Sequence, residues 1–230
     1  MRIVFVRHGH PDYARDCLTD EGKIQAEIVA KRLADEGICE IYASSMGRAR
    51  ETAAPLSRDS GLPVTLLDFM REIRWGSSSG KKIAEGGHPW LFMPGYIRSG
   101  GDVYNRNFED MDAFQDNDIL LACIDKVKSG IDAWLSERGF CREGDRYRVK
   151  SDENMDKTVA IFSHGGSSTV VLSHFFNFPF PASIIMIRPY FTSVTVVRFE
   201  GEEGDLIIPK IELLTDDRHL KVKGEVTINN

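Results

Sequence analysis

The chain has 230 residues, of which 42% are hydrophobic and 28% are charged, and this composition is typical of a globular protein with one sizeable core. Its formal net charge of -6 provides no general attraction to nucleic acid or to an anionic membrane, and we expect neither as a partner. Any anionic ligand must therefore be held by a local group of arginines.

The four cysteines indicate reduced thiols rather than a disulfide framework or a zinc site. Cys17, Cys39, Cys123 and Cys141 lie far apart, with no paired spacing. The apolar run at residues 3–6 is too short for a signal peptide, and no stretch approaches the roughly 20 apolar residues of a membrane span. We expect a cytoplasmic protein of one domain.

Residues 3–67 alternate between apolar runs and helical patterns. Residues 3–6 form a short continuous apolar run, as in a strand buried on both faces. Thr19 offers a capping hydroxyl and acidic residues follow it, so a helix is expected from there to Gly37. The apolar residues at helical spacing are Ile24, Ile28, Val29 and Leu33. Residues 38–43 and 63–67 predict strands, with a helix at residues 48–60 between them.

Residues 76–118 lose this periodicity, which is typical of a lid or an insertion. Residues 120–135 then predict a long amphipathic helix that Gly139 closes. After a polar stretch at 141–157, strands are predicted at 158–162, 183–187, 193–199 and 206–214, and a helix at 169–176. Strands that alternate with helices imply an α/β sheet, and we expect a loose polar tail from residue 221.

Arg7-His8-Gly9 directly follows the first predicted strand. The carboxyl end of a strand delivers side chains into the crevice that open α/β sheets use for ligands. A histidine attacks phosphorus only as the neutral imidazole with one ring nitrogen free, so its other nitrogen should donate to a fixed acceptor such as a backbone carbonyl. Taken alone, the tripeptide is better explained as a strand-end histidine with ordinary hydrogen bonds.

A second group of candidate residues follows the strand at residues 38–43. Residues 44–53 open a helix, where backbone amides and a guanidinium can together hold a phosphate. Arg48 is the better candidate because it lies nearer the helix start. Arg50 is expected to be solvated and paired with Glu51 or Asp59.

Two further candidates lie at other strand ends. His164, in Ser163-His164-Gly165-Gly166, is placed to donate to a phosphate oxygen beside the positive end of a helix, and its alternative role is a helix cap. Glu72 follows the strand at residues 63–67. With a raised pKa, Glu72 would protonate a leaving oxygen and later take a proton from water. Its alternative role is a surface ion pair with Arg71 or Arg74.

Together these segments resemble the histidine phosphatase superfamily, also called the phosphoglycerate mutase-like family. Arg7-His8-Gly9, residues 18–22, residues 45–53, Glu72 and residues 163–167 occur in that family's order and approximate spacing. The resemblance implies a three-layer α/β/α sandwich with a mostly parallel sheet, in which residues 76–118 form a lid insertion.

The same resemblance implies a role for each candidate residue. His8 would take the phosphoryl group and Glu72 would be the proton donor. The residues that would hold the phosphoryl oxygens are Arg7, Arg48, His164 and Gly165. No metal or cofactor would be needed.

The sequence departs from the family pattern after its first motif. Many members read RHGE[TS] followed by an asparagine near the phosphate, whereas His10 and Ala14 stand at these positions here. His10, Tyr13 and His88 are the candidates to replace the missing contact. Residues 77–80 replace the tryptophan-glutamate-glycine run usual after the glutamate, which leaves the substrate side of the pocket undefined.

The resemblance implies a phosphomonoesterase that hydrolyses a small phosphorylated metabolite through phosphohistidine. A mutase, which returns the phosphoryl group to a second hydroxyl, is less favoured. Members of that branch carry Glu-Arg-His-Tyr-Gly, where this chain has Glu72-Ile73-Arg74-Trp75-Gly76, and a later insertion that is not found here. The third hypothesis is a catalytically silent protein that binds a phosphorylated ligand.

The sequence offers fewer indications of the substrate and of the oligomeric state than of the reaction. Lys81, Lys82, Arg98 and Arg106, all within residues 76–118, are candidates to attract a substrate with more than one anionic group. The apolar final strands are compatible with a homodimer.

Overall fold

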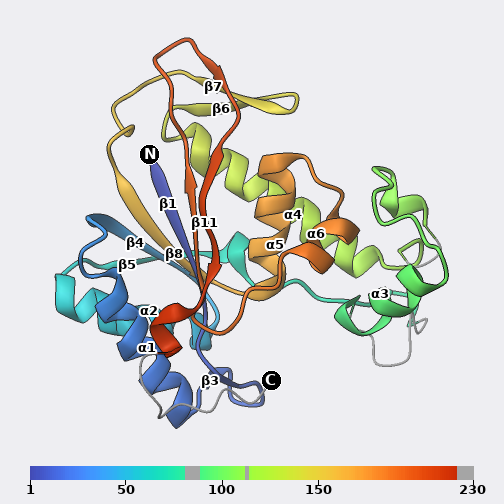
Figure 1. Cartoon of the computed structure of the whole chain (residues 1–230), viewed down its shortest axis with the longest axis horizontal. Coiled ribbons are helices and arrows are strands. Elements are labelled where there is room, and N and C mark those ends of the chain that lie inside the picture. Colours follow the sequence, from blue (N-terminus) through green and yellow to red (C-terminus); the bar gives the residue numbers. More distant parts are fainter. Residues whose placement is uncertain (81–88, 112–113, 222–230) are drawn as a thin grey trace.

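The computed structural model describes residues 1–80, 89–111 and 114–221, and its central feature is a six-stranded sheet (Figure 1). The strand order is β11-β9-β1-β8-β4-β5. The strands are β1 (Arg2–Arg7), β4 (Ile38–Ser44), β5 (Val64–Leu67), β8 (Thr158–Ser163), β9 (Val194–Arg198) and β11 (Lys210–Asp216). Strands β1, β8, β4 and β5 are parallel to one another, and β9 is antiparallel to β1 and β11. The sheet is therefore mostly parallel, as predicted.

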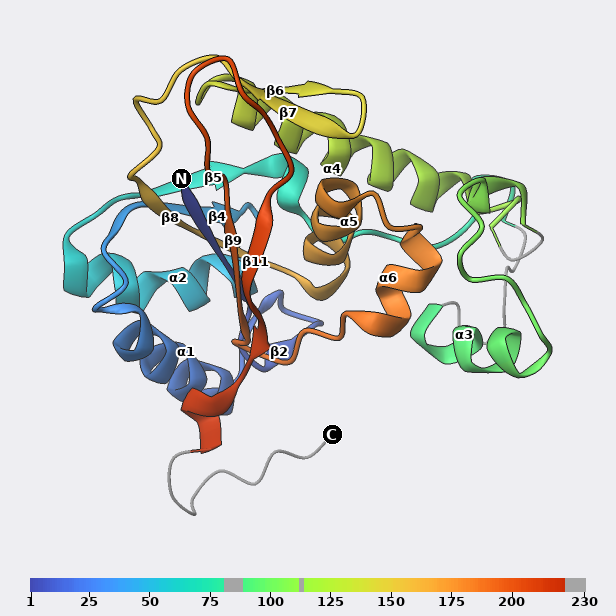
Figure 2. The same ribbon diagram turned by 45° about the horizontal axis from the view of Figure 1, so that its top comes forward.

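Helices cover both faces of this sheet and make a three-layer α/β/α sandwich (Figures 1 and 2). One face carries α1 (Asp20–Leu33) and α2 (Gly47–Ser60), and the other carries α4 (Asp118–Ser136), α5 (Gly165–Phe176) and α6 (Phe180–Met186). Successive side chains of a strand point to opposite faces, so β1 contributes to two cores. Val4 and Val6 pack with α1, whereas Ile3 and Phe5 belong to the core on the α4 side.

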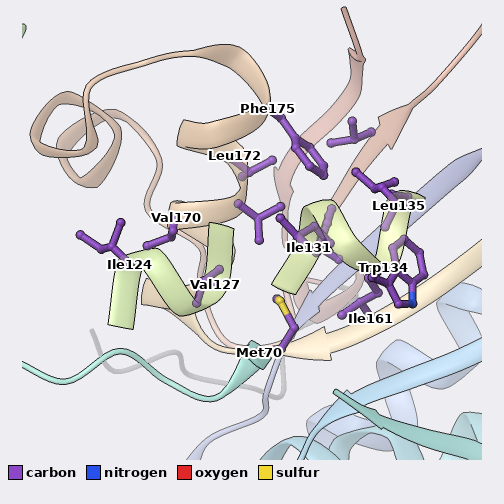
Figure 3. Packing of buried hydrophobic residues seen from close by; sticks show 14 of the residues in the cluster. Met70, Ile124, Val127, Ile131, Trp134, Leu135, Ile161, Val170, Leu172 and Phe175 are labelled. Carbon is purple, nitrogen blue, oxygen red and sulfur yellow. The ribbon is translucent and has the colours of Figure 1, made fainter. Parts of the chain in front are cut away.

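The larger core lies between α4, α5 and the sheet (Figure 3). Its labelled members are Met70, Ile124, Val127, Ile131, Trp134, Leu135, Ile161, Val170, Leu172 and Phe175. In α4 the buried positions recur every three or four residues, which confirms the helix predicted at residues 120–135. This packing fixes α5 against the sheet, and α5 begins directly after His164.

Two predicted elements are wrong for identifiable reasons. Residues 183–186 lie in helix α6, not in a strand, and Ile187 is the residue that ends this helix. A proline at the second helical position favours the helix start, and burial of most of this short helix leaves no amphipathic pattern to read. The polar stretch after Gly139 contains a hairpin of β6 (Phe140–Glu143) and β7 (Arg146–Val149). The arginines of β7 alternate with the buried Tyr147 and Val149, so the segment was interpreted as a polar stretch and not as a strand.

The predicted strand at residues 206–214 is divided between two sheets. β10 (Leu206–Ile207) pairs with β7 in a three-stranded sheet, whereas β11 pairs with β9. Pro209 stands between them and has no N–H group to continue the pairing. A short hairpin of β2 (Pro11–Asp12) and β3 (Cys17–Leu18) lies between β1 and α1.

Residues 76–118 are not wholly irregular, because helix α3 (Pro89–Arg98) and a 3-10 helix (Phe108–Asp110) form within them. Lys81, Lys82, His88 and the predicted tail beyond residue 221 lie outside the described residues. All four cysteines are described, and each is free. No single helix in the described ranges is long and apolar enough to cross a membrane. The pair α5 and α6 meets that test only jointly, with a bend of 119° between them.

Helix α1 begins where the sequence predicted, since the side chain of Thr19 accepts a hydrogen bond from the N–H of Gly22. Its buried face is shifted from the predicted one. Ile24 is 57% exposed, and small residues such as Ala26 and Ala30 are buried instead. Small side chains allow α1 and α2 to approach each other closely, so the largest apolar residue in the first two turns points outward.

Replacement of Ile131 by alanine should lower the free energy of unfolding by about 3 kcal/mol, because this fully buried side chain of α4 leaves a cavity when it is truncated. Ile24→Ala is the matched control and should change the free energy by less than about 0.5 kcal/mol. Urea denaturation followed by circular dichroism measures both values. Equal losses in the two variants would contradict the arrangement of the cores.

Candidate active site

Neighbouring parallel strands bring two histidines together. β1 and β8 pair with Arg7 opposite Ser163, and the N–H group of His8 donates to the carbonyl of Ser163 at 2.9 Å. The residues that follow the two strands are His8 and His164, whose ring centroids lie 5.2 Å apart. Both rings are buried. The register of the sheet therefore places the two sequence motifs in one site.

His8 has one ring nitrogen fixed and the other free. Its Nδ1 lies 2.7 Å from the carbonyl oxygen of Gly9, and a carbonyl only accepts, so Nδ1 carries the proton. Nε2 has no hydrogen bond to any described residue. Burial lowers the pKa of His8 to about 3, and the positive charge of Arg7 is the second cause. At neutral pH His8 is thus an uncharged imidazole with a lone pair on Nε2, the form that a nucleophile requires.

Three buried nitrogen atoms near His8 have no hydrogen-bond partner in the part of the chain that the structure describes. They are Nε of Arg7, Nε of Arg48 and Nδ1 of His164. Buried donors almost always have a partner, so three of them in one site indicate a place for an anion with several acceptor oxygens. We call these three atoms the anion-binding donors.

The second histidine is held by Ser44. The Ser44 hydroxyl lies 2.8 Å from Nε2 of His164 and also accepts from the N–H group of Met46. When this hydroxyl donates its own hydrogen to Nε2, the proton of the neutral ring lies on Nδ1, where it can be donated to an anion. Burial and the neighbouring His8 and arginines hold the pKa of His164 well below its usual value.

Arg7 is held by the segment that follows α6. Its Nη1 donates to the carbonyl of Pro189 at 2.7 Å, and its guanidinium carbon lies 4.3 Å from the centre of the Phe191 ring. Burial lowers the pKa of Arg7 from its usual value, but a guanidinium remains charged in proteins. Phe191, whose ring also lies 5.7 Å from that of His8, had no recognisable signal in the sequence.

Arg48 belongs to the site and Arg50 does not. Arg48 lies in the first turn of α2 and is 4% exposed, whereas Arg50 is exposed. Nη1 of Arg48 donates to the carboxylate of Asp16 at 2.5 Å, a contact that sequence reasoning missed. Tyr13 is 66% exposed, and its ring centre lies 5.4 Å from the Arg48 guanidinium.

Glu72 lies against the start of α5. Its oxygens accept hydrogen bonds from the N–H groups of Ile73, Gly166 and Ser167 at 3.0 to 3.3 Å. A Cβ atom on Gly166 would lie 2.5 Å from Oε1 of Glu72, so this approach requires glycine. Burial raises the pKa of the Glu72 carboxyl although these hydrogen bonds oppose the shift. Within the described ranges the predicted alternative, an ion pair with Arg71 or Arg74, is not formed.

The remaining predicted site residues have structural contacts. His10 is bound to the start of α1, because its Nδ1 lies 2.9 Å from Oγ1 of Thr19 and its N–H group donates to Gln25 at 2.7 Å. Gly165 is the first residue of α5, and a Cβ atom there would lie 3.6 Å from Nε of Arg7. Gly165 therefore borders one of the anion-binding donors directly.

A cavity of about 680 Å³ opens beside Arg48 and Glu72. Its charged lining residues beyond these two are Asp68, Arg71, Arg74 and Lys126, and its apolar lining residues include Met46, Phe69, Ile73, Trp75 and Val127. Asp68 connects two of the cations, since it accepts from Lys126 at 2.6 Å and from the Ser45 hydroxyl at 2.8 Å, and Ser45 in turn accepts from Arg71. Arg98 and Arg106, which the sequence suggested for this role, do not line this cavity.

The fold and the site together define an α/β protein with a histidine-centred anion site at the carboxyl ends of parallel strands. The model of the histidine phosphatase superfamily (branch 1) matches residues 3–116, about half of the chain. This chain belongs to the histidine phosphatase superfamily.

Individual known proteins show how far the similarity extends. A probable phosphatase of Schizosaccharomyces pombe is 33% identical over 95 residues, 37% of this chain and 46% of that protein. The probable phosphoglycerate mutase GpmB of Photorhabdus laumondii is 31% identical over 85 residues, 33% of this chain and 40% of that protein. The chain thus matches less than half the length of these curated relatives.

Solved structures share the fold over nearly the whole chain. The phosphoserine phosphatase of Entamoeba histolytica, solved with 3-phosphoglyceric acid, has a TM-score of 0.63 at 20% identity, with 95% of this chain and 98% of that chain covered. A mycobacterial glucosyl-3-phosphoglycerate phosphatase has a TM-score of 0.63 at 18% identity, with 93% and 98% covered.

The ring of His8 should not titrate between pH 8 and pH 5, because its pKa lies near 3. Two-dimensional ¹H–¹⁵N NMR of the histidine rings should show His8 with its proton on Nδ1 throughout this range. The signal is assigned by its loss in His8→Gln. A His8 signal that moves with a midpoint near the ordinary value of about 6.5 would contradict the buried, neutral site.

Proposed function

We propose that this protein is a phosphomonoesterase that hydrolyses a small phosphorylated metabolite through a phosphohistidine on His8. One observation carries the proposal: His8 is neutral, and neither its Nε2 nor the three anion-binding donors beside it have a hydrogen-bond partner among the described residues. A phosphoryl group has three oxygens over which negative charge is spread, which suits donors from Arg7, Arg48 and His164.

In the first step, Nε2 of His8 attacks the phosphorus atom of the substrate. A phosphorus–nitrogen bond forms and the ester phosphorus–oxygen bond breaks. The leaving oxygen takes the proton of the Glu72 carboxyl, so that the alcohol departs neutral and Glu72 becomes a carboxylate. The raised pKa of Glu72 supports this role, because it keeps the carboxyl protonated to a higher pH than usual.

In the second step, water attacks the phosphohistidine. The Glu72 carboxylate takes a proton from this water, the phosphorus–nitrogen bond breaks, and inorganic phosphate leaves. His8 and Glu72 return to their starting protonation states. The guanidinium groups of Arg7 and Arg48 stabilise the charge on the phosphoryl oxygens in both steps.

The cavity beside Glu72 supports a substrate whose alcohol part carries a second anionic group. Three cationic side chains line it, those of Arg71, Arg74 and Lys126, although the whole chain carries a net charge of -6. Its acidic lining residues are Asp68 and Glu72, and the raised pKa of Glu72 favours its uncharged form. Among the described residues, Arg74 has no hydrogen-bond or ion-pair partner. Cationic walls of this kind attract anionic substrates into a cleft.

Phosphoglycerate mutase activity is the second candidate, because the curated relatives include probable phosphoglycerate mutases as well as a probable phosphatase. In a mutase, the phosphohistidine would return its phosphoryl group to a second hydroxyl of the bound molecule instead of to water. The chemistry at His8 is the same in both candidates, so the fate of the phosphoryl group distinguishes them.

Replacement of His8 by alanine should abolish turnover, because the atom that receives phosphorus is removed. In the unaltered protein, rapid acid-free quenching followed by mass spectrometry should detect one phosphoryl group on His8 during turnover. His10→Ala is the matched control and should retain the phosphorylated intermediate. Full activity of His8→Ala would refute the proposal.

The three functional hypotheses give different products from a small set of substrates. The test uses p-nitrophenyl phosphate, glycerol 3-phosphate, and 3-phosphoglycerate with its bisphosphate activator. Phosphate release without isomer formation supports the phosphomonoesterase, isomer formation supports the mutase, and no reaction indicates a silent binding protein. Glycerol 3-phosphate and 3-phosphoglycerate differ in one carboxylate, so equal kcat/KM values for them would contradict the second anionic group.

Glu72→Gln should lower kcat/KM for 3-phosphoglycerate by about a hundredfold or more, since general acid catalysis contributes about 10²–10⁴. In the unaltered protein kcat/KM should fall as the pH rises through the raised pKa of Glu72, because the protonated carboxyl is the donor. Glu72→Gln should lack this alkaline fall. With p-nitrophenyl phosphate, whose leaving group needs little protonation, the loss should be much smaller. Equal losses for the two substrates would argue against proton donation by Glu72.

A further inference from the structure

A carboxylate of the protein lies at the edge of the proposed phosphate site. Asp16 ends the short loop between β2 and β3, and its two oxygens take two different donors. Oδ1 accepts from Nη1 of Arg48 at 2.5 Å, and Oδ2 accepts from the N–H group of Gly47 at 2.8 Å. A guanidinium and the first N–H group of a helix are donors that suit a phosphate equally well.

The backbone around Asp16 is shaped to keep it there. Asp16 has a φ of 51°, in the left-handed region that residues other than glycine rarely adopt. A Cβ atom on Gly47 would lie 2.0 Å from the carbonyl oxygen of Asp16, so the first residue of α2 must be glycine for the loop to pack against it. Asp12 stabilises the same loop, because its Oδ1 accepts from the N–H groups of Ala14 and Arg15.

The charge of Asp16 matters because few groups in the site are charged. His8 and His164 are neutral, and the raised pKa of Glu72 favours its uncharged form. Arg7 and Arg48 carry the positive charge, and Asp16 offsets one of them. Nε of Arg48 is still buried and without a partner among the described residues, so Asp16 occupies one edge of the guanidinium and leaves the other for the ligand.

We propose that Asp16 is an internal counter-ion that sets the affinity of this site for phosphate. It holds the Arg48 guanidinium in position and also repels a bound dianion, which lowers the affinity of the site for inorganic phosphate. This inference rests on the proposed function, in which inorganic phosphate is the product that must leave. A site with two uncompensated arginines around a dianion would release that product slowly.

Asp16→Asn tests the proposal because it removes the charge and keeps the shape and an acceptor oxygen. Asparagine also caps a helix start as well as aspartate does, so the fold should be retained. The affinity for inorganic phosphate at pH 7.5, measured by isothermal titration calorimetry, should rise about tenfold, which corresponds to about 1.4 kcal/mol. The gain should shrink as ionic strength increases, because salt screens the repulsion from a half-exposed carboxylate.

Asp59→Asn is the matched control. It removes the same charge from the far end of α2, where Asp59 is paired with Arg58, and should leave phosphate affinity unchanged. Asp16→Ser keeps a hydroxyl for the N–H group of Gly47, and it provides a second uncharged variant if Asp16→Asn unfolds. Thermal unfolding of each variant checks that the fold is intact.

The outcomes separate this inference from the proposed function. Tighter phosphate binding in Asp16→Asn supports the counter-ion. Unchanged or weaker binding overturns it and leaves Asp16 as a residue that only positions Arg48, and the absence of measurable phosphate binding in every variant overturns it as well. The proposed function is judged independently, by phosphohistidine formation on His8 in the unaltered protein.

Discussion

The hydrogen bond from Nδ1 of His8 to the carbonyl of Gly9 is the interaction on which the site depends. It joins consecutive residues, so the direction of the chain at the end of β1 decides which ring nitrogen carries the proton. Burial then keeps the ring uncharged. Without this bond, the proton of the neutral ring could lie on either nitrogen, and Nε2 would not always have its lone pair free.

The start of α5 organises the other half of the site. His164 precedes this helix, and the carboxyl of Glu72 lies against its first N–H groups. A helix start favours a negative charge, whereas burial disfavours it, and burial is the larger effect on Glu72. In the proposed reaction, the same helix end can therefore receive the carboxylate that forms when Glu72 gives up its proton. An acid and its conjugate base are both accommodated without a change in the surrounding backbone.

Much of the fold and of the site could be predicted because the informative residues are local. His8, Arg48, Glu72 and His164 each follow a predicted strand, and parallel strands end at one edge of a sheet. The fold prediction failed where a local pattern had two readings: the apolar run of α6 lacks periodicity, and the arginines of β7 conceal alternate buried residues. Tertiary packing decided these cases.

Other parts of the site have no local signal. Ser44 was visible only as a polar residue after a strand, and its role depends on His164, which lies 120 positions away along the chain. Asp16 lies in a loop whose path is set by packing on Gly47, and Phe191 comes from the far end of the sequence. The cationic cavity likewise combines α4 with the residues after β5. Such contacts follow from the assembled layers and not from any one segment.

The support of Arg7 has a consequence for how this site can be tuned from a distance. The segment after α6 holds the Arg7 side chain through Pro189 and binds its backbone through the N–H group of Thr192. α6 in turn contacts α3, which belongs to the region between residues 76 and 118. A change in the position of that outer region can therefore be transmitted through α6 to Arg7, which precedes His8. Two proteins with identical motifs can differ in how this segment positions Arg7. The motifs alone therefore do not determine the geometry of the site.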